Sequence, residues 1–366
     1  MLCESDFQNP AGTRQALDRI RDLAAVTGPV RIMEVCGTHT MAIARCGLKS
    51  LLPPEVRLIS GPGCPVCVTP AGVIDGILRL TEDPSVTIAS YGDLLRVPGS
   101  RRGDCLLRRK AAGASVESVY SAMDALALAR KRPDRQVVFL GVGFETTAPG
   151  TAACIQEASS RRVLNFSVLS LLKQTEPALR ALIAAPDFGV DAFLCPGHVA
   201  AITGAQAFRF LPDAFGLPAV VSGFEAGDLV FSILELMRML AYKKPDLVNE
   251  YRRLVKPEGN PAARRMIRQV FASCASQWRG LGEIPEGGLA IRGEYAHLDA
   301  AVRFDFQSED AGEIPGCRCS DVIRGVLDPQ DCPLFQTVCT PADPVGPCMV
   351  SGEGSCAAAS RFRQLS

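Results

Sequence analysis

The strongest constraint on the fold is a repeated pattern in which a short apolar run ends in a turn and leads into a helix-like stretch. The runs are VRIMEVCG, VRLISGPG, VTIASYGD, QVVFLGVGFETT, VLNFSVLS, VDAFLCPGHV and LPAVVSGFE. Such β-branched runs, alternating with helical patterns, indicate a parallel sheet that is covered on both faces. Apolar periodicity predicts helices over residues 13–26, 71–80, 121–132 and 225–244. The expected fold class is α/β.

The chain has 366 residues, so more than one domain is expected. The polar segment KRPDR contains Pro133 and is typical of a boundary between two α/β units. After about residue 245 the strand–turn–helix pattern stops, and cysteine, proline and glycine become frequent. The sequence therefore predicts two parallel-sheet α/β domains, at residues 1–132 and 133–245, and a cysteine-rich C-terminal region at 246–366.

Charge and hydropathy exclude several function classes. Lysine plus arginine equals aspartate plus glutamate, at 39 each, which removes the main reason to expect nucleic-acid binding. The N-terminus lacks the order of a signal peptide, and no apolar run is long enough to cross a bilayer. We therefore expect a soluble, cytoplasmic protein that binds neither nucleic acid nor a membrane.

The chemically unusual residues follow the predicted strands directly. In open α/β sheets, ligand sites gather beyond the carboxyl ends of the strands. Five predicted strands end in thiols, carboxylates or two of only three histidines, namely Cys36 with His39, Cys64 with Cys67, Glu145, His198 and Glu225. We expect these side chains to form the functional site.

Cys64 and Cys67 have the C-x-x-C spacing, which lets two sulfurs form a disulfide or bind one metal. The preceding Gly-Pro-Gly and the internal Pro65 favour a rigid turn and a functional role over inert packing. No second C-x-x-C stands at zinc-finger spacing, so redox chemistry or an open metal site fits better than structural zinc.

The other strand-end residues each have a functional and a structural interpretation. Cys36 and His39 are spaced so that the imidazole could lower the thiol pKa or share a metal, and the alternative is a buried cysteine beside a capping histidine. Glu145 is a candidate catalytic carboxylate or a carboxylate favoured at a helix N-terminus. His198 is a candidate catalytic group or a loop histidine bonded to the backbone.

Six of the fifteen cysteines fall in the last fifty residues. Without a secretory signal, this density favours a metal or iron–sulfur module over a disulfide framework. A [4Fe-4S] cluster requires four thiolates, and zinc is the rival because soft thiolates suit both. The spacing alone leaves both open for Cys317, Cys319, Cys332, Cys339, Cys348 and Cys356.

Six motifs in this order resemble the [NiFe]-hydrogenase maturation protein HypD family. They are EVCGTHT, GPGCPVCV, GFETT, CPGHV, WRGLG at residues 278–282, and a terminal CPLF…C-T-P…MVS-x-EG-x-C. The resemblance extends from about Arg31 to Cys356. It implies an iron–sulfur protein that assembles the Fe(CN)2CO unit of the hydrogenase active site with a small partner, HypC. It also implies HypE as the cyanide donor and the hydrogenase large subunit as an indirect partner.

The same resemblance implies roles for individual residues. The essential N-terminal thiols fall on Cys36, Cys64 and Cys67, with iron held transiently by Cys36. The [4Fe-4S] ligands fall on Cys319, Cys332, Cys339 and Cys356, in a C-x12-C-x6-C-x16-C pattern, while Cys317 and Cys348 are extra. Two other functions remain open: a cluster-dependent thiol–disulfide oxidoreductase acting on a protein substrate, and a structural cluster on a small-molecule-binding protein.

Overall fold

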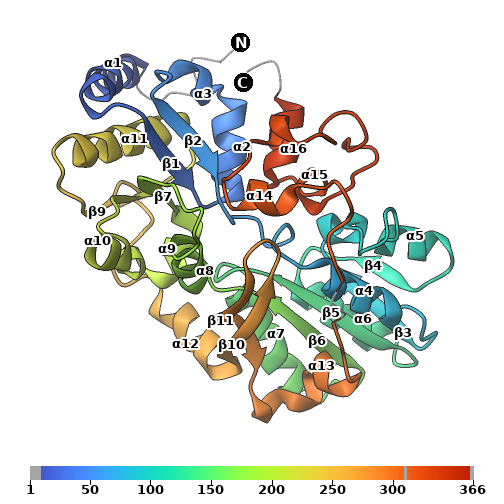
Figure 1. The fold of residues 1–366 in the computed structure, drawn as a ribbon. Helices are drawn as coiled ribbons and strands as arrows, with labels where there is room; N and C mark the ends of the chain where they lie inside the picture. Colours follow the sequence, from blue (N-terminus) through green and yellow to red (C-terminus); the bar gives the residue numbers. More distant parts are fainter. Residues whose placement is uncertain (1–9, 309–310, 363–366) are drawn as a thin grey trace.

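The predicted strands form, and they divide between two parallel sheets (Figure 1). The computed structural model describes residues 10–308 and 311–362. Sheet A has five strands in the order β2 (Val56–Ser60), β1 (Val30–Glu34), β7 (Ala192–Pro196), β8 (Ala219–Ser222) and β9 (Leu247–Asn249). Sheet B has four, in the order β4 (Val116–Ser118), β3 (Val86–Ser90), β5 (Gln136–Gly143) and β6 (Phe166–Leu172).

The strand pairing does not follow the expected division at residue 133. Sheet A joins β1 and β2 to three strands from beyond residue 190, and sheet B joins β3 and β4 to β5 and β6. The chain thus leaves sheet A after β2, builds sheet B, and returns to sheet A at β7. Parallel strands are joined by long crossovers, so the order along the chain does not fix which strands pair.

Helices lie against the sheets, and side-chain caps begin several of them, including α6 and α11. The α6 helix (Ala122–Lys131) begins after Ser121, whose side chain accepts the Asp124 amide. A capping box of Glu225 and Asp228 starts α11 (Ala226–Ala241). The other helices that begin before residue 200 are α1 (Pro10–Thr27), α2 (Gly37–Arg45), α3 (Leu48–Leu51), α4 (Ala71–Leu80), α5 (Leu106–Ala111), α7 (Ala148–Ser160), α8 (Thr175–Ile183) and α9 (Gly197–Thr203). All four helices expected from periodicity are present, as α1, α4, α6 and α11.

Apolar side chains on the two faces of each sheet enter different cores. On sheet A, Ile32 and Leu58 face α1 and α11, while Met33 and Ile59 face the large central core. On sheet B, Phe139 and Val137 pack with α6 and α7, while Val138 and Leu140 enter the same central core. This two-sided burial explains why the strands are continuously apolar and not alternating.

The region after residue 245 contains more α/β structure than the sequence pattern predicts. β9 extends sheet A, and the antiparallel hairpin of β10 (Phe271–Trp278) and β11 (Gly282–Ile291) packs on β6 of sheet B (Figure 1). The β10 strand was not predicted, because its exposed face is mostly polar and its sequence, FASCASQW, contains no continuous apolar run. The α10 helix (Phe210–Phe215) precedes β8. The helices after residue 245 are α12 (Pro261–Val270), α13 (Ala300–Arg303), α14 (Cys319–Ile323), α15 (Pro347–Val350) and α16 (Ser355–Arg361).

The cysteine-rich segment forms its own small layer against sheet A. It contains α14, α15 and α16, and α16 contacts α2, as the red part of Figure 1 shows beside the blue helix. The expectation of no signal peptide lies partly outside the described residues. Within residues 10–308 and 311–362, no helix combines the length and apolar character needed to cross a bilayer.

Truncating Phe139 should reveal how much the sheet B core contributes to stability. This ring is fully buried and packs edge-on against Tyr91, with 5.5 Å between ring centroids. Phe139→Ala should lower the free energy of unfolding by about 3–5 kcal/mol, measured by denaturant titration. Leu164, which is 69% exposed, is the control, and Leu164→Ala should change it by less than about 0.5 kcal/mol. Equal effects of both substitutions would contradict this packing.

Candidate functional site

A cavity of about 140 Å³ lies where the carboxyl ends of the two sheets meet. Its lining comes from the segments that follow β1, β2, β5, β6 and β7, and from the C-terminal segment. This agrees with the expectation that strand ends gather the functional residues. The lining includes Cys36, Thr38, Gly63, Pro65, Thr146, Thr147, Thr175, His198 and Glu353.

Cys36 is buried at the N-terminal cap position of α2. Burial raises the pKa of its thiol to about 12, and the carboxylate of Glu353 raises it further. Backbone amides of His39 and Thr38 act in the opposite direction but do not outweigh burial. The thiol is therefore protonated near neutral pH, and a bound metal would have to displace its proton.

The expectation that the His39 imidazole lowers the thiol pKa is wrong. The ring is fully buried, its Nε2 lies 2.9 Å from the Gly223 carbonyl oxygen, and it packs in a tilted arrangement against Phe224, with 4.7 Å between ring centroids. Desolvation lowers the pKa of His39 to about 4, so the ring is neutral and adds no positive charge beside Cys36. Its Nδ1 has no hydrogen-bond partner among the described residues.

His198 contacts the same aromatic ring as His39. Its imidazole stacks on Phe224 at 3.8 Å and lines the cavity. Partial desolvation lowers the pKa of His198. Phe224 follows β8 and contacts both histidines, which come from different strand ends.

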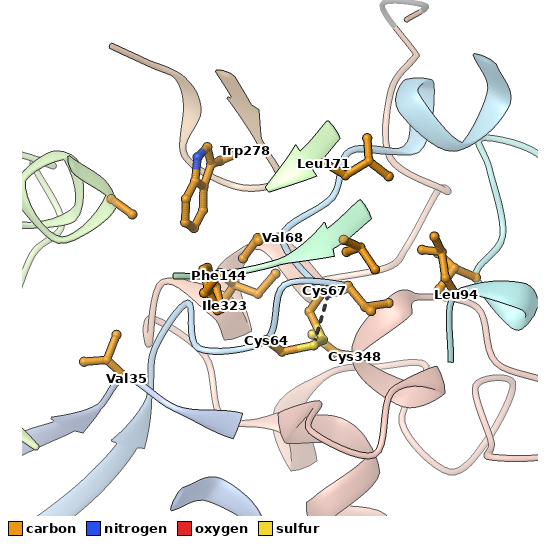
Figure 2. Packing of buried hydrophobic residues seen from close by; sticks show 14 of the residues in the cluster. Val35, Cys64, Cys67, Val68, Leu94, Phe144, Leu171, Trp278, Ile323 and Cys348 are labelled. Carbon is orange, nitrogen blue, oxygen red and sulfur yellow. Dashed lines mark hydrogen bonds between the residues drawn. A yellow bond between two sulfur atoms is a disulfide. The ribbon is translucent and has the colours of Figure 1, made fainter. Parts of the chain in front are cut away.

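Cys64 and Cys67 form a disulfide, with 5.2 Å between their Cα atoms. Both side chains are buried, and the sulfur of Cys67 lies 3.8 Å from the carbonyl oxygen of Pro347. Figure 2 shows the pair in the central core, with Phe144 and Val68 on one side and Cys348 on the other. The disulfide loop thus touches the segment that carries Cys348.

Glu145 accepts hydrogen bonds at the N-terminus of a helix and does not line the cavity of Cys36. Its two carboxylate oxygens accept the amide and the hydroxyl of Thr175, at 2.7 and 2.8 Å. Thr175 is the first residue of α8. These contacts therefore support the interpretation of Glu145 as a carboxylate favoured at a helix N-terminus. Burial raises the pKa of Glu145. Its other side faces a larger neighbouring cavity of about 540 Å³.

Sequence reasoning missed Glu353, which reaches the site from the C-terminal segment. Its carboxylate accepts the Thr38 hydroxyl at 3.1 Å, and burial raises the pKa of Glu353. A Cβ on Gly37 would lie 2.3 Å from the Glu353 Cβ, and one on Gly63 would lie 2.4 Å from the Cys36 amide nitrogen. The motif S-x-EG-x-C was the available signal, but nothing local in it indicates the partner Thr38.

A second buried carboxylate, Glu34, was also missed. It ends β1 directly before the site, where Oε1 accepts the Thr40 hydroxyl at 2.6 Å and Oε2 lies 3.5 Å from the Cys36 amide nitrogen. Burial raises the pKa of Glu34 to about 7. This acid anchors the turn that carries Cys36, and its position inside an apolar strand was the signal in the sequence.

All six C-terminal cysteines line one small cavity. The sulfurs of Cys319 and Cys348 are 2.8 Å apart. Burial acts to raise the pKa of Cys319, but hydrogen bonds with the thiols of Cys317 and Cys348 outweigh it and lower that pKa. The four expected ligands therefore lie together, and the extra pair, Cys317 and Cys348, lies with them. In the described part of the chain, no group of three or more His, Cys, Asp or Glu side chains is placed so that it could hold a single metal ion.

The donor set of this cavity fits an iron–sulfur cluster in its chemistry. Six thiol groups converge, whereas iron–sulfur clusters need four thiolates. The only charged side chain in the lining is Arg318, and leucine, valine, methionine and phenylalanine side chains complete it. A soft, largely apolar and sulfur-rich environment is what such a cluster requires.

Comparison with known proteins agrees with the geometry of these motifs. The family model described as "HypD: Hydrogenase formation hypA family" matches residues 12–363. Hydrogenase maturation factor HypD2 of Bradyrhizobium diazoefficiens is 45% identical over 346 residues, covering 93% of this chain and 91% of that protein. Hydrogenase maturation factor HypD of Escherichia coli is 42% identical over 365 residues, covering 98% and 97%.

A third relative, Hydrogenase maturation factor HypD of Rhizobium leguminosarum bv. viciae, is 44% identical over 362 residues, covering 95% of this chain and 94% of that protein. The similarity thus spans both sheets, the hairpin and the cysteine-rich segment alike. The chain belongs to the HypD family of hydrogenase maturation factors.

Proposed function

We propose that this chain is the scaffold on which the Fe(CN)2CO unit of the [NiFe]-hydrogenase active site is assembled. A small HypC-type partner would supply a second thiolate for the iron, and a HypE-type protein would donate cyanide. The observation that carries the proposal is the Cys36 thiol, which lines a small cavity at the junction of five strand-end segments. Iron is cargo in this scheme, and Cys36 is its ligand on this chain.

The electrostatics of Cys36 favour a metal ligand over a free nucleophile. A thiol with a pKa of about 12 holds very little thiolate near neutral pH, so it reacts slowly with disulfides. Metal binding ionises such a thiol because the cation compensates the buried negative charge. The neutral ring of His39 adds no competing positive charge at the site.

The surrounding residues would position the cargo and limit water. Phe224 packs against both histidines and so restricts their rings. The hydrogen bond between Thr38 and Glu353 fixes both side chains at the N-terminus of α2. Burial raises the pKa of Glu353, whose carboxylate lies at the cavity wall and accepts the Thr38 hydroxyl. Glu145 contributes indirectly, since it fixes Thr175, which lines the cavity.

We further propose that Cys319, Cys332, Cys339 and Cys356 hold a [4Fe-4S] cluster, which supplies electrons when bound. The contact of Cys67 with Pro347 supports a short path between the disulfide and this cysteine group. The alternative of a thiol–disulfide oxidoreductase acting on a protein requires an accessible disulfide. Cys64 and Cys67 are only 5% and 2% exposed, which argues against a protein substrate reaching them.

Replacing the proposed iron ligand should abolish the assembled unit without unfolding the chain. In the complex of Cys36→Ser with its small partner, the infrared bands of metal-bound cyanide and carbonyl should be lost. Cys105→Ser removes another buried thiol outside the cavity and should retain them. Unchanged bands in Cys36→Ser would remove this residue from the ligand set.

Removing a proposed cluster ligand should release iron and sulfide. Cys332→Ala and Cys339→Ala should each lose the brown absorption and most bound iron, while far-ultraviolet circular dichroism stays near the wild-type signal. Cys348→Ala is the matched control and should keep the cluster. Loss of the cluster in Cys348→Ala, with retention in Cys319→Ala, would transfer the ligand role from Cys319 to Cys348.

The disulfide should open and close with redox conditions. Under mild oxidant, Cys64 and Cys67 should lose alkylation together, measured by mass spectrometry after denaturation, and recover it with a dithiol. Cys154 and Cys274 should be alkylated equally in both states. A pair that stays fully alkylated at every potential tested would have a role in packing or metal binding only.

A further inference from the structure

The tip of the β10–β11 hairpin lies between the disulfide loop and the cysteine-rich segment. Trp278 lies near Val68 and Phe144 in Figure 2, and its ring stacks on Phe144 at 6.0 Å. A Cβ on Gly280, whose φ is +79°, would lie 2.9 Å from the carbonyl oxygen of Ser320 in α14. The WRGLG motif therefore contacts three parts of the molecule that carry functional residues.

Arg279 makes the polar contacts of this tip. Its Nε and Nη2 both donate to the Thr69 carbonyl oxygen, at 3.1 and 3.0 Å, and its backbone amide donates to the Val68 carbonyl oxygen at 2.8 Å. Its Nη1 pairs with Glu313, which precedes the cysteine-rich segment. The side chain of Arg279 is only 3% exposed, whereas that of Glu313 is 35% exposed.

Hydrogen bonds continue from Thr69 into the disulfide loop itself. The Thr69 hydroxyl donates to the carbonyl oxygen of Pro65, which stands between the two cysteines, at 2.9 Å. The amide of Val68 donates to the Cys64 carbonyl oxygen at 3.2 Å. Arg279 is thus connected to Pro65 through Thr69. Hydrogen bonds to the donors of a buried guanidinium fix its position.

We propose that Arg279 is a positioning residue that sets the reduction potential of the Cys64–Cys67 disulfide by holding its loop in the bonded geometry. This deepens the proposed function, in which the pair is the redox-active thiol pair. The physical basis is effective concentration: a loop that keeps two thiols close favours the disulfide over the dithiol.

The equilibrium is measured against glutathione with the full-length chain. Two glutathione thiols each give up one electron and one proton, their sulfurs join, and the Cys64–Cys67 bond breaks to give two thiols. Arg279→Gln should move this equilibrium about tenfold toward the dithiol, which is about 30 mV for a two-electron couple. Arg279→Lys should give a smaller shift, because lysine keeps the charge but cannot donate in the same bidentate geometry.

Two matched substitutions separate positioning from charge. Glu313→Gln removes the ion pair but leaves the bonds from Arg279 to Thr69, so the equilibrium constant should stay at the wild-type value. Arg209→Gln, at a surface arginine paired with Asp246, should also leave it unchanged. A shift in Glu313→Gln as large as that in Arg279→Gln would overturn positioning in favour of a charge effect.

Local hydrogen exchange gives a second measurement. In Arg279→Gln, the amides of Val68 and Thr69 should exchange faster, while those of β5 keep their protection. If Arg279→Gln fails to fold, Thr69→Val removes the bond to Pro65 and should shift the equilibrium in the same direction. An unchanged equilibrium in folded Arg279→Gln, or in Thr69→Val, overturns the inference, whereas absent infrared bands would overturn only the scaffold proposal.

Discussion

The burial of the Cys36 thiol at the meeting point of two sheets is the constraint on which the rest of the site depends. Gly63 lets the turn after β2 approach the Cys36 amide, and Gly37 lets Glu353 approach from the C-terminal segment. Burial removes most of the water around the thiol, and its pKa rises to about 12. Strand order, glycine placement and the packing of the cysteine-rich segment together enclose the Cys36 thiol.

Desolvation also gives the neighbouring groups unusual protonation states. The pKa of His39 falls to about 4 and that of Glu34 rises to about 7, so both groups can be uncharged beside an uncharged thiol. Such a site has little affinity for anions and little intrinsic nucleophilicity. The Cys36 thiol gains a buried negative charge when a cation arrives with it, which agrees with a ligand that binds iron as cargo.

Local sequence patterns predicted the elements and the strand-end chemistry but not the long-range partners. The apolar strands, four helices and the C-x-x-C pair follow from short-range periodicity and spacing. The pairing of β1 with β7 and the approach of Glu353 to Thr38 join residues that are far apart in sequence, and no local pattern encodes them. The His39 ring misled prediction because the Gly223 carbonyl, not the nearby thiol, determines its position.

Proton release on iron binding tests the central claim about Cys36 most directly. If the thiol is protonated in the free protein and a thiolate in the loaded one, binding of ferrous iron near neutral pH should release about one proton more in wild type than in Cys36→Ala. Calorimetry in buffers of different ionisation enthalpy measures this number. Equal proton release by the two proteins would contradict the account, because Cys36 would then be either already ionised or not a ligand.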